Sequence, residues 1–240
     1  TVLDGVALVL LGLTTVLGPW LFGGNKLTLM GPLMVAIAVS AALVSYRFLV
    51  SPYRRDGVVP PGGWLLLGLV AYLAARWPFA EVRYDAALET VRFLAYLLAF
   101  WSWANLLRFH SRWKILLALL MLSASLMAWY ALIQDVHGTR MVLNQERPEQ
   151  YAMRASGAYI CPNHFAHLMQ MLIPVGIGVV ACRSAGVALR LVAGYSALIA
   201  LPALYLTESR SGLIGLLAGL VTLAVAVSLR RGLKKFLLVL

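Results

Sequence analysis

Residues 154–175 read RASGAYICPNHFAHLMQMLIPV, and residues 206–212 read LTESRSG. The first stretch opens a segment, 155–182, that contains no Asp, Glu, Lys or Arg. About 20 apolar residues are enough for a helix to cross a bilayer. We therefore expect a transmembrane helix with a polar first turn, and a second polar turn between two later spans.

The composition places the whole chain in the same class. Hydrophobic residues make up 62% of it and charged residues 12%, whereas soluble domains are about 45–50% apolar and about 25% charged. The apolar runs are continuous rather than alternating, which favours helices over a barrel. We predict an all-α fold, a polytopic transmembrane helical bundle of about eight spans forming one transmembrane domain over residues 1–240. The windows that predict these spans are 5–25, 27–46, 57–75, 93–107, 115–134, 155–182, 191–207 and 211–229.

The ends of the chain predict a longer protein. The sequence begins at Thr1 rather than Met, and residues 236–240 resemble the start of a ninth apolar segment. We therefore expect this chain to be the N-terminal portion of a larger one.

The distribution of charge predicts the orientation of the spans. The connections that follow the second, fourth, sixth and eighth spans together hold twelve of the twenty basic residues and one acid, Asp56. The other connections hold eight basic residues and seven of the nine acids. Lys and Arg concentrate on the cytoplasmic side of membrane proteins, so we expect a cytoplasmic N-terminus. The net charge of +11 then indicates contact with anionic lipids rather than with nucleic acid.

Two connections that face outward in this topology are more than short turns. Residues 77–92 place acids at 81, 85 and 89 and apolar residues at helical spacing, which predicts an amphipathic segment opening near Pro78 and lying on the membrane. A metal site made of the three carboxylates is the alternative, although no His accompanies them. Residues 135–161 form the largest outward-facing loop.

Polar groups at the start of the sixth span favour an anion. Pro162 suits the first turn of a helix, and free N–H groups at a helix start attract negative charge. Asn163 and His164 lie in this turn, with Arg154 just before it.

Arg210 lies in a second polar island, 207–211, on the same predicted side. Because the guanidinium fork matches phosphate oxygens in pairs, we expect Arg154 and Arg210 to hold one pyrophosphate. Alternatively, each arginine anchors a helix end at the membrane surface, or Glu208 pairs with Arg210.

Other patterns in this region favour structural roles. His164 and His167 could share a helix face, but without carboxylate or thiolate partners they make a weak metal site, and we expect neither metal nor cofactor. Gly215 and Gly219 have the GxxxG spacing of a helix-packing face.

The two stretches together resemble the O-antigen ligase and polymerase superfamily. That family shows a Gly-x-[Phe/Tyr]-x-Asn-Pro-Asn-x-x-Ala pattern at the start of one span and, about forty-five residues later, a [Thr/Ser]-x-Ser-Arg-[Gly/Ser] pattern between two spans. Cys161 stands where the family often has Asn. The matching residues are Gly157, Tyr159, Pro162, Asn163, Ala166, Thr207, Ser209, Arg210 and Ser211.

The resemblance implies a glycosyltransferase of the bacterial inner membrane. Its members move a glycan from an undecaprenyl-pyrophosphate carrier to an acceptor glycan, lipid or protein on the outer face, without a metal ion. Arg210 would then stabilise the leaving pyrophosphate. The family's general base is a histidine on a large outward loop, which would lie beyond Leu240. The substrate-binding residues would be Arg154, Asn163, His164 and Ser209.

Two alternatives have other functions. A shortened relative could be a non-catalytic helical subunit that packs against membrane-protein partners. A transporter for lipid-linked sugars would need ionisable residues near the middle of its spans, and the windows contain no Asp, Glu, Lys or Arg.

Overall fold

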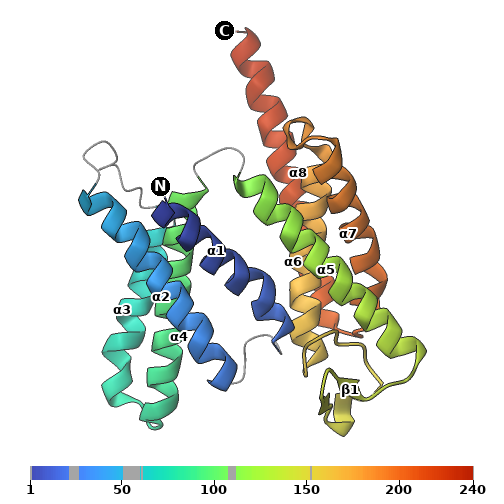
Figure 1. The fold of residues 1–240 in the computed structure, drawn as a ribbon. Helices are drawn as coiled ribbons and strands as arrows, with labels where there is room; N and C mark the ends of the chain where they lie inside the picture. Colours follow the sequence, from blue (N-terminus) through green and yellow to red (C-terminus); the bar gives the residue numbers. More distant parts are fainter. Residues whose placement is uncertain are drawn as a thin grey trace. The chain divides into compact units, whose positions relative to one another are not determined.

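The computed structural model describes residues 2–21, 27–50, 60, 62–107, 112–151 and 153–239, without the side chains of residue 27 and of residues 230–239. The described chain is helical apart from one short hairpin (Figure 1). Lys26, Arg54, Arg55, Asp56, Arg108 and His110 lie outside the described residues. The longer helices are α1 (Val2–Leu17), α2 (Leu27–Val50), α3 (Gly63–Arg76), α4 (Arg83–Leu106), α5 (Arg112–Val136), α6 (Pro162–Ala181), α7 (Val187–Tyr205) and α8 (Arg210–Val239).

Within the part of the chain that the structure describes, six helical segments are long and apolar enough to cross a membrane: Val2–Trp20, Thr28–Val50, Arg112–Val136, Pro162–Ala181, Val187–Tyr205 and Arg210–Leu229. The chain is therefore an all-α, multi-pass membrane protein. The apolar segment Gly63–Phe79 is shorter, and α4 carries charges in its first turns. The count of about eight spans stays a prediction.

The chain divides into two compact units. The first comprises Thr1–Gly18 and Gly24–Trp113, and the second comprises Pro19–Gly23 and Lys114–Leu240. Each unit has its own hydrophobic core. The expected single transmembrane domain stays a prediction.

A buried ion pair joins two helices of the first unit. Arg47 donates to Asp4 Oδ1 at 2.9 Å, and both side chains are almost fully buried. The sequence predicts Arg47 in a connecting loop, but it lies in the last turn of α2. Because Asp4 opens α1, the pair places the start of α1 and the end of α2 at the same end of the unit, as the predicted topology requires.

The amphipathic segment at 77–92 differs from the prediction. Pro78 lies in a short 3-10 helix, η4 (Trp77–Phe79), and α4 begins at Arg83 and continues without a break to Leu106. Among the described residues no group of three His, Cys, Asp or Glu side chains could hold a metal ion. The three carboxylates therefore do not form the alternative metal site.

The end of the chain also differs from the prediction. Helix α8 runs through the basic residues at 230–235 to Val239, so residues 236–239 extend it rather than start a ninth helix. This stretch contains no proline that would end the helix.

In the second unit, α6 packs against both α7 and α8 (Figure 1). Glycines allow the close approach, as the GxxxG spacing predicts. A Cβ atom at Gly212 would lie 2.8 Å from Ala166 Cβ, and one at Gly219 would lie 2.9 Å from Pro174 Cγ. At Gly215 a Cβ atom would meet the amide of Gln170. These glycines of α8 form a seam against α6, which we call the α6–α8 seam.

Hydrogen bonds show which connections of the second unit share an end. Lys114 Nζ donates to the carbonyl of Ser184 at 2.7 Å, which joins the start of α5 to η6 (Arg183–Ala185), between α6 and α7. At the other end, Ala155 N–H donates to the carbonyl of Leu206 at 3.0 Å. We call this second end, with the 137–161 loop, the loop end.

Candidate functional site

Arg154 ties the two sequence motifs together at the loop end. Its Nε donates to the carbonyl of Thr207 at 2.7 Å, and one terminal nitrogen donates to Asn163 Oδ1 at 2.7 Å. The start of α6 and the α7–α8 turn are therefore joined through one guanidinium. Because Arg154 bonds both Thr207 and Asn163, these contacts connect two elements of the fold. We call this structural role of Arg154 a brace.

The α7–α8 turn is built by its own hydroxyl groups. The Thr207 hydroxyl donates to the carbonyl of Leu204 at 2.6 Å, near the end of α7. The Ser209 hydroxyl accepts a bond from Gly212 N–H at 3.3 Å, the pattern of a helix N-cap on α8. Both residues are buried. The sequence predicts that Ser209 binds substrate, but in this structure its hydroxyl accepts a hydrogen bond from the backbone of α8.

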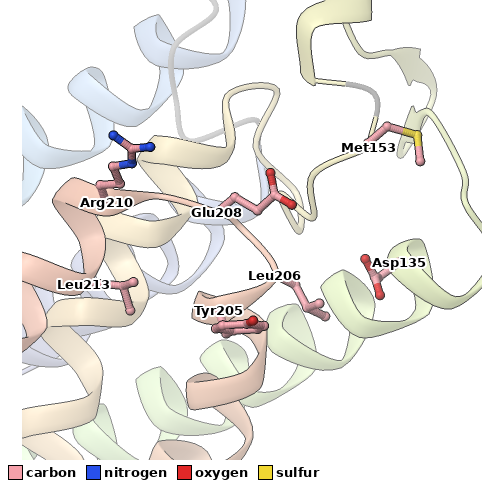
Figure 2. A pocket seen from close by; sticks show the side chains of 7 residues that line it. All are labelled: Asp135, Met153, Tyr205, Leu206, Glu208, Arg210 and Leu213. Carbon is pink, nitrogen blue, oxygen red and sulfur yellow. The ribbon is translucent and has the colours of Figure 1, made fainter.

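Arg210 is different, because it is exposed and no described residue accepts a hydrogen bond from it or pairs with it. It is the first residue of α8. The alternative pairing with Glu208 is absent, and Figure 2 shows the two side chains extending in different directions. Glu208 adopts a left-handed backbone conformation, with φ of 50°, which is uncommon for a residue with a side chain.

A pocket of about 270 Å³ opens beside Arg210 (Figure 2). Its lining combines apolar side chains with two carboxylates. The lining residues are Asp135, Met153, Tyr205, Leu206, Glu208, Arg210 and Leu213. We call this the Arg210 pocket.

A smaller pocket of about 60 Å³ lies next to it and shares Asp135 and Met153. Arg154 lines this smaller pocket, whereas Arg210 lines only the larger one. The sequence predicts one site clasped by both arginines; in the structure they line adjoining pockets.

Arg147 organises the loop, a role that the sequence did not indicate. It is 4% exposed and donates to the backbone carbonyls of Thr139, Arg140 and Arg154. Burial lowers the pKa of its guanidinium. The hairpin of β1 (Met141–Val142) and β2 (Gln145–Glu146) and the 3-10 helix η5 (Glu149–Tyr151) belong to the same loop. The sequence carried no signal for Arg147, since it is one of eight basic residues in the connections predicted to face outward.

The start of α6 agrees with the sequence. The helix begins at Pro162, with Pro in its first turn, and Gly157 has φ of 56°, a left-handed conformation that glycine adopts readily. His164 and His167 are exposed, and His167 Nε2 lies 3.4 Å from the Ser211 hydroxyl. Neither histidine lines the Arg210 pocket.

Gly157 offers a test of how the loop is anchored. An alanine Cβ would lie 2.9 Å from the Phe165 ring and 3.0 Å from Met127 Cγ, in addition to the left-handed strain of about 1–2 kcal/mol. Overpacking adds about 1–3 kcal/mol. We therefore expect Gly157→Ala to lower the thermal unfolding temperature in detergent by several degrees.

The matched control is Gly138→Ala. Gly138 has φ of 57° and no atom within 4 Å of its Cβ position, so this variant has the strain without the clash. An equal loss of stability in both variants would contradict the packing described for Gly157.

Comparison of the chain with models of protein families, with curated proteins and with solved structures found no match. The geometry of the loop end and the two sequence motifs are therefore the basis for the function proposed below.

Proposed function

We propose that the protein is a glycosyltransferase of the O-antigen ligase and polymerase type. It moves a glycan from an undecaprenyl-pyrophosphate carrier to an acceptor at the outer face of the bacterial inner membrane. In this proposal the N-terminus is cytoplasmic, the loop end faces outward, and no metal ion takes part.

The observation that carries the proposal is the state of Arg210. It is an exposed guanidinium at the first residue of a membrane helix, it has no partner among the described residues, and it lines a pocket. Arginine and the N–H groups of a helix start are both suited to phosphate oxygens. The family pattern also has arginine at this position of its second motif.

The surrounding contacts fix the backbone from which Arg210 extends. Ser209 caps α8, Arg154 holds the α7–α8 turn against α6, and the α6–α8 seam fixes the helix itself. Donors that are already in place stabilise developing charge without reorganisation during the reaction. As the bond between the sugar and the pyrophosphate breaks, Arg210 would offset the negative charge on the departing oxygen.

Binding of the carrier lipid tests the proposal. We expect the full-length protein in lipid nanodiscs to bind undecaprenyl pyrophosphate at least about tenfold more tightly than undecaprenol, which has the same chain without the diphosphate. Microscale thermophoresis or native mass spectrometry would measure both affinities. Equal affinity for the two lipids would overturn the proposal and favour the non-catalytic subunit.

A further inference from the structure

The lining of the Arg210 pocket carries charges of both signs. Arg210 extends from the start of α8, whereas Asp135 belongs to the last turn of α5. Glu208 lies in the turn between α7 and α8. Figure 2 shows Arg210 and Asp135 on opposite sides of the view, with Glu208 between them. Two carboxylates in the lining disfavour a ligand that is an anion throughout, because like charges repel. The lining therefore fits a ligand that is anionic at one end only.

The two carboxylates are available to accept hydrogen bonds. Asp135 and Glu208 are exposed, and neither side chain has a hydrogen-bond donor or an ion-pair partner among the described residues. Glu208 also has a left-handed backbone, with φ of 50°, which glycine would adopt at lower cost. Strain of this kind at a non-glycine residue is typical of functional sites. A carboxylate only accepts hydrogen bonds, so the hydroxyl groups of a sugar are suitable partners.

The ring of Tyr205 gives the same pocket an aromatic surface. Tyr205 is the last residue of α7 and is 73% exposed. In Figure 2 its side chain lies across from Glu208, between Arg210 and Asp135. A pyranose ring has an apolar C–H face that can lie on an aromatic ring, and hydroxyl groups around its edge. Pockets for drug-sized ligands measure about 300–1,000 Å³, so a pocket of about 270 Å³ suits one sugar ring rather than an extended glycan.

Building on the proposed function, we propose that the Arg210 pocket binds the sugar joined directly to the pyrophosphate and selects against an acidic sugar at this position. Arg210 contacts the pyrophosphate, and the ring of Tyr205 lies against the sugar. The carboxylates of Asp135 and Glu208 accept hydrogen bonds from its hydroxyl groups. A sugar with a carboxylate of its own meets two like charges and binds weakly. Asp135 and Glu208 are therefore specificity-determining residues, and neither takes part in proton transfer.

Two synthetic carrier lipids that differ in one group test the proposal. One is undecaprenyl pyrophosphate joined to glucose, and the other is the same lipid joined to glucuronic acid, in which a carboxylate replaces the hydroxymethyl group. Native mass spectrometry of the full-length protein in lipid nanodiscs would measure both affinities. We expect the glucose carrier to bind at least about tenfold more tightly than the glucuronic acid carrier. This ratio should fall as salt is added, because salt screens exposed charges.

The ratio of the two affinities isolates the sugar, because removing a carboxylate near Arg210 also strengthens binding of the pyrophosphate in both carriers. The double variant Asp135→Asn with Glu208→Gln keeps the shape of both side chains, and its ratio should fall below about threefold. Glu146→Gln is the matched control, since Glu146 is an exposed carboxylate of the same loop that does not line the pocket. It should keep the wild-type ratio.

A second pair of variants tests the aromatic surface. Tyr205→Ala should weaken binding of the glucose carrier at least about fivefold, and it should leave the affinity for sugar-free undecaprenyl pyrophosphate unchanged. Tyr205→Phe keeps the ring, so it should bind the glucose carrier as the wild type does. An equal loss of affinity for the sugar-free lipid in Tyr205→Ala would overturn the contact between this ring and the sugar.

The outcomes separate the specificity from the proposed function. Equal affinity of the wild-type protein for the two sugar carriers, or an unchanged ratio in the double variant, would overturn the selection by Asp135 and Glu208. The proposed function would survive either result if undecaprenyl pyrophosphate still bound more tightly than undecaprenol. Failure of the wild-type protein to prefer undecaprenyl pyrophosphate over undecaprenol would instead overturn the proposed function itself.

Discussion

Replacing Arg210 with alanine should abolish measurable glycan transfer while leaving the protein folded in the membrane. Arg210 has no partner among the described residues and is exposed, so its removal leaves no buried group unsatisfied. If it stabilises the departing pyrophosphate, the rate should fall at least about a hundredfold, as for the loss of one preorganised donor in other active sites. Accumulation of the glycan-loaded carrier lipid in cells that contain only the variant would measure the effect.

Two further variants sharpen this test. Arg210→Lys keeps the charge but loses the planar fork, so we expect only partial activity. Arg140→Ala removes an exposed arginine of the same loop that does not line the Arg210 pocket, and it should transfer glycan at the wild-type rate. Normal transfer by Arg210→Ala would refute the role given to this residue.

Replacing Arg154 with alanine should weaken both stability and transfer. Two hydrogen bonds from the guanidinium would be lost, one of them to the carbonyl of the buried Thr207. Hydrogen bonds from charged groups contribute about 1.5–3 kcal/mol each, and partial exposure of Arg154 lowers that value. We expect a loss of about 1–3 kcal/mol in the free energy of unfolding and roughly a tenfold to hundredfold loss in transfer.

The pattern of effects distinguishes a brace from a phosphate ligand. Arg154→Lys cannot bond Thr207 and Asn163 together, since its single ammonium lacks the fork, so it should be nearly as unstable as Arg154→Ala. Asn163→Ala should show a smaller loss of the same kind. A variant of Arg154 with wild-type unfolding temperature and lost transfer would contradict the brace and support direct contact with substrate.

The sequence was sufficient to predict the class of fold and the start of α6. Continuous apolar windows and Pro162 are local signals, and the structure confirms the helix start. The packing role of Gly215 and Gly219 was also predictable, because a fixed spacing of small residues defines one helix face.

The candidate site was predictable only in part. Motif spacing indicated Arg154 and Arg210, but only the folded chain shows that Arg154 donates to the Thr207 carbonyl and that Arg210 has no acceptor among the described residues. The same limit applies to Arg47 and Arg147, whose partners are distant or are backbone atoms of a loop. Asp135 belongs to no sequence motif, and only the folded chain places it in the lining of the Arg210 pocket.

The glycines along α8 have a mechanical consequence. Gly219 is nine residues from Arg210, about 13 Å along the helix axis. A methyl group introduced there would clash with the Pro174 ring. If α8 tilts as a rigid body to relieve the clash, its first turn, which carries Arg210, is displaced. A substitution at Gly219 can therefore displace Arg210 without changing any residue that lines the Arg210 pocket.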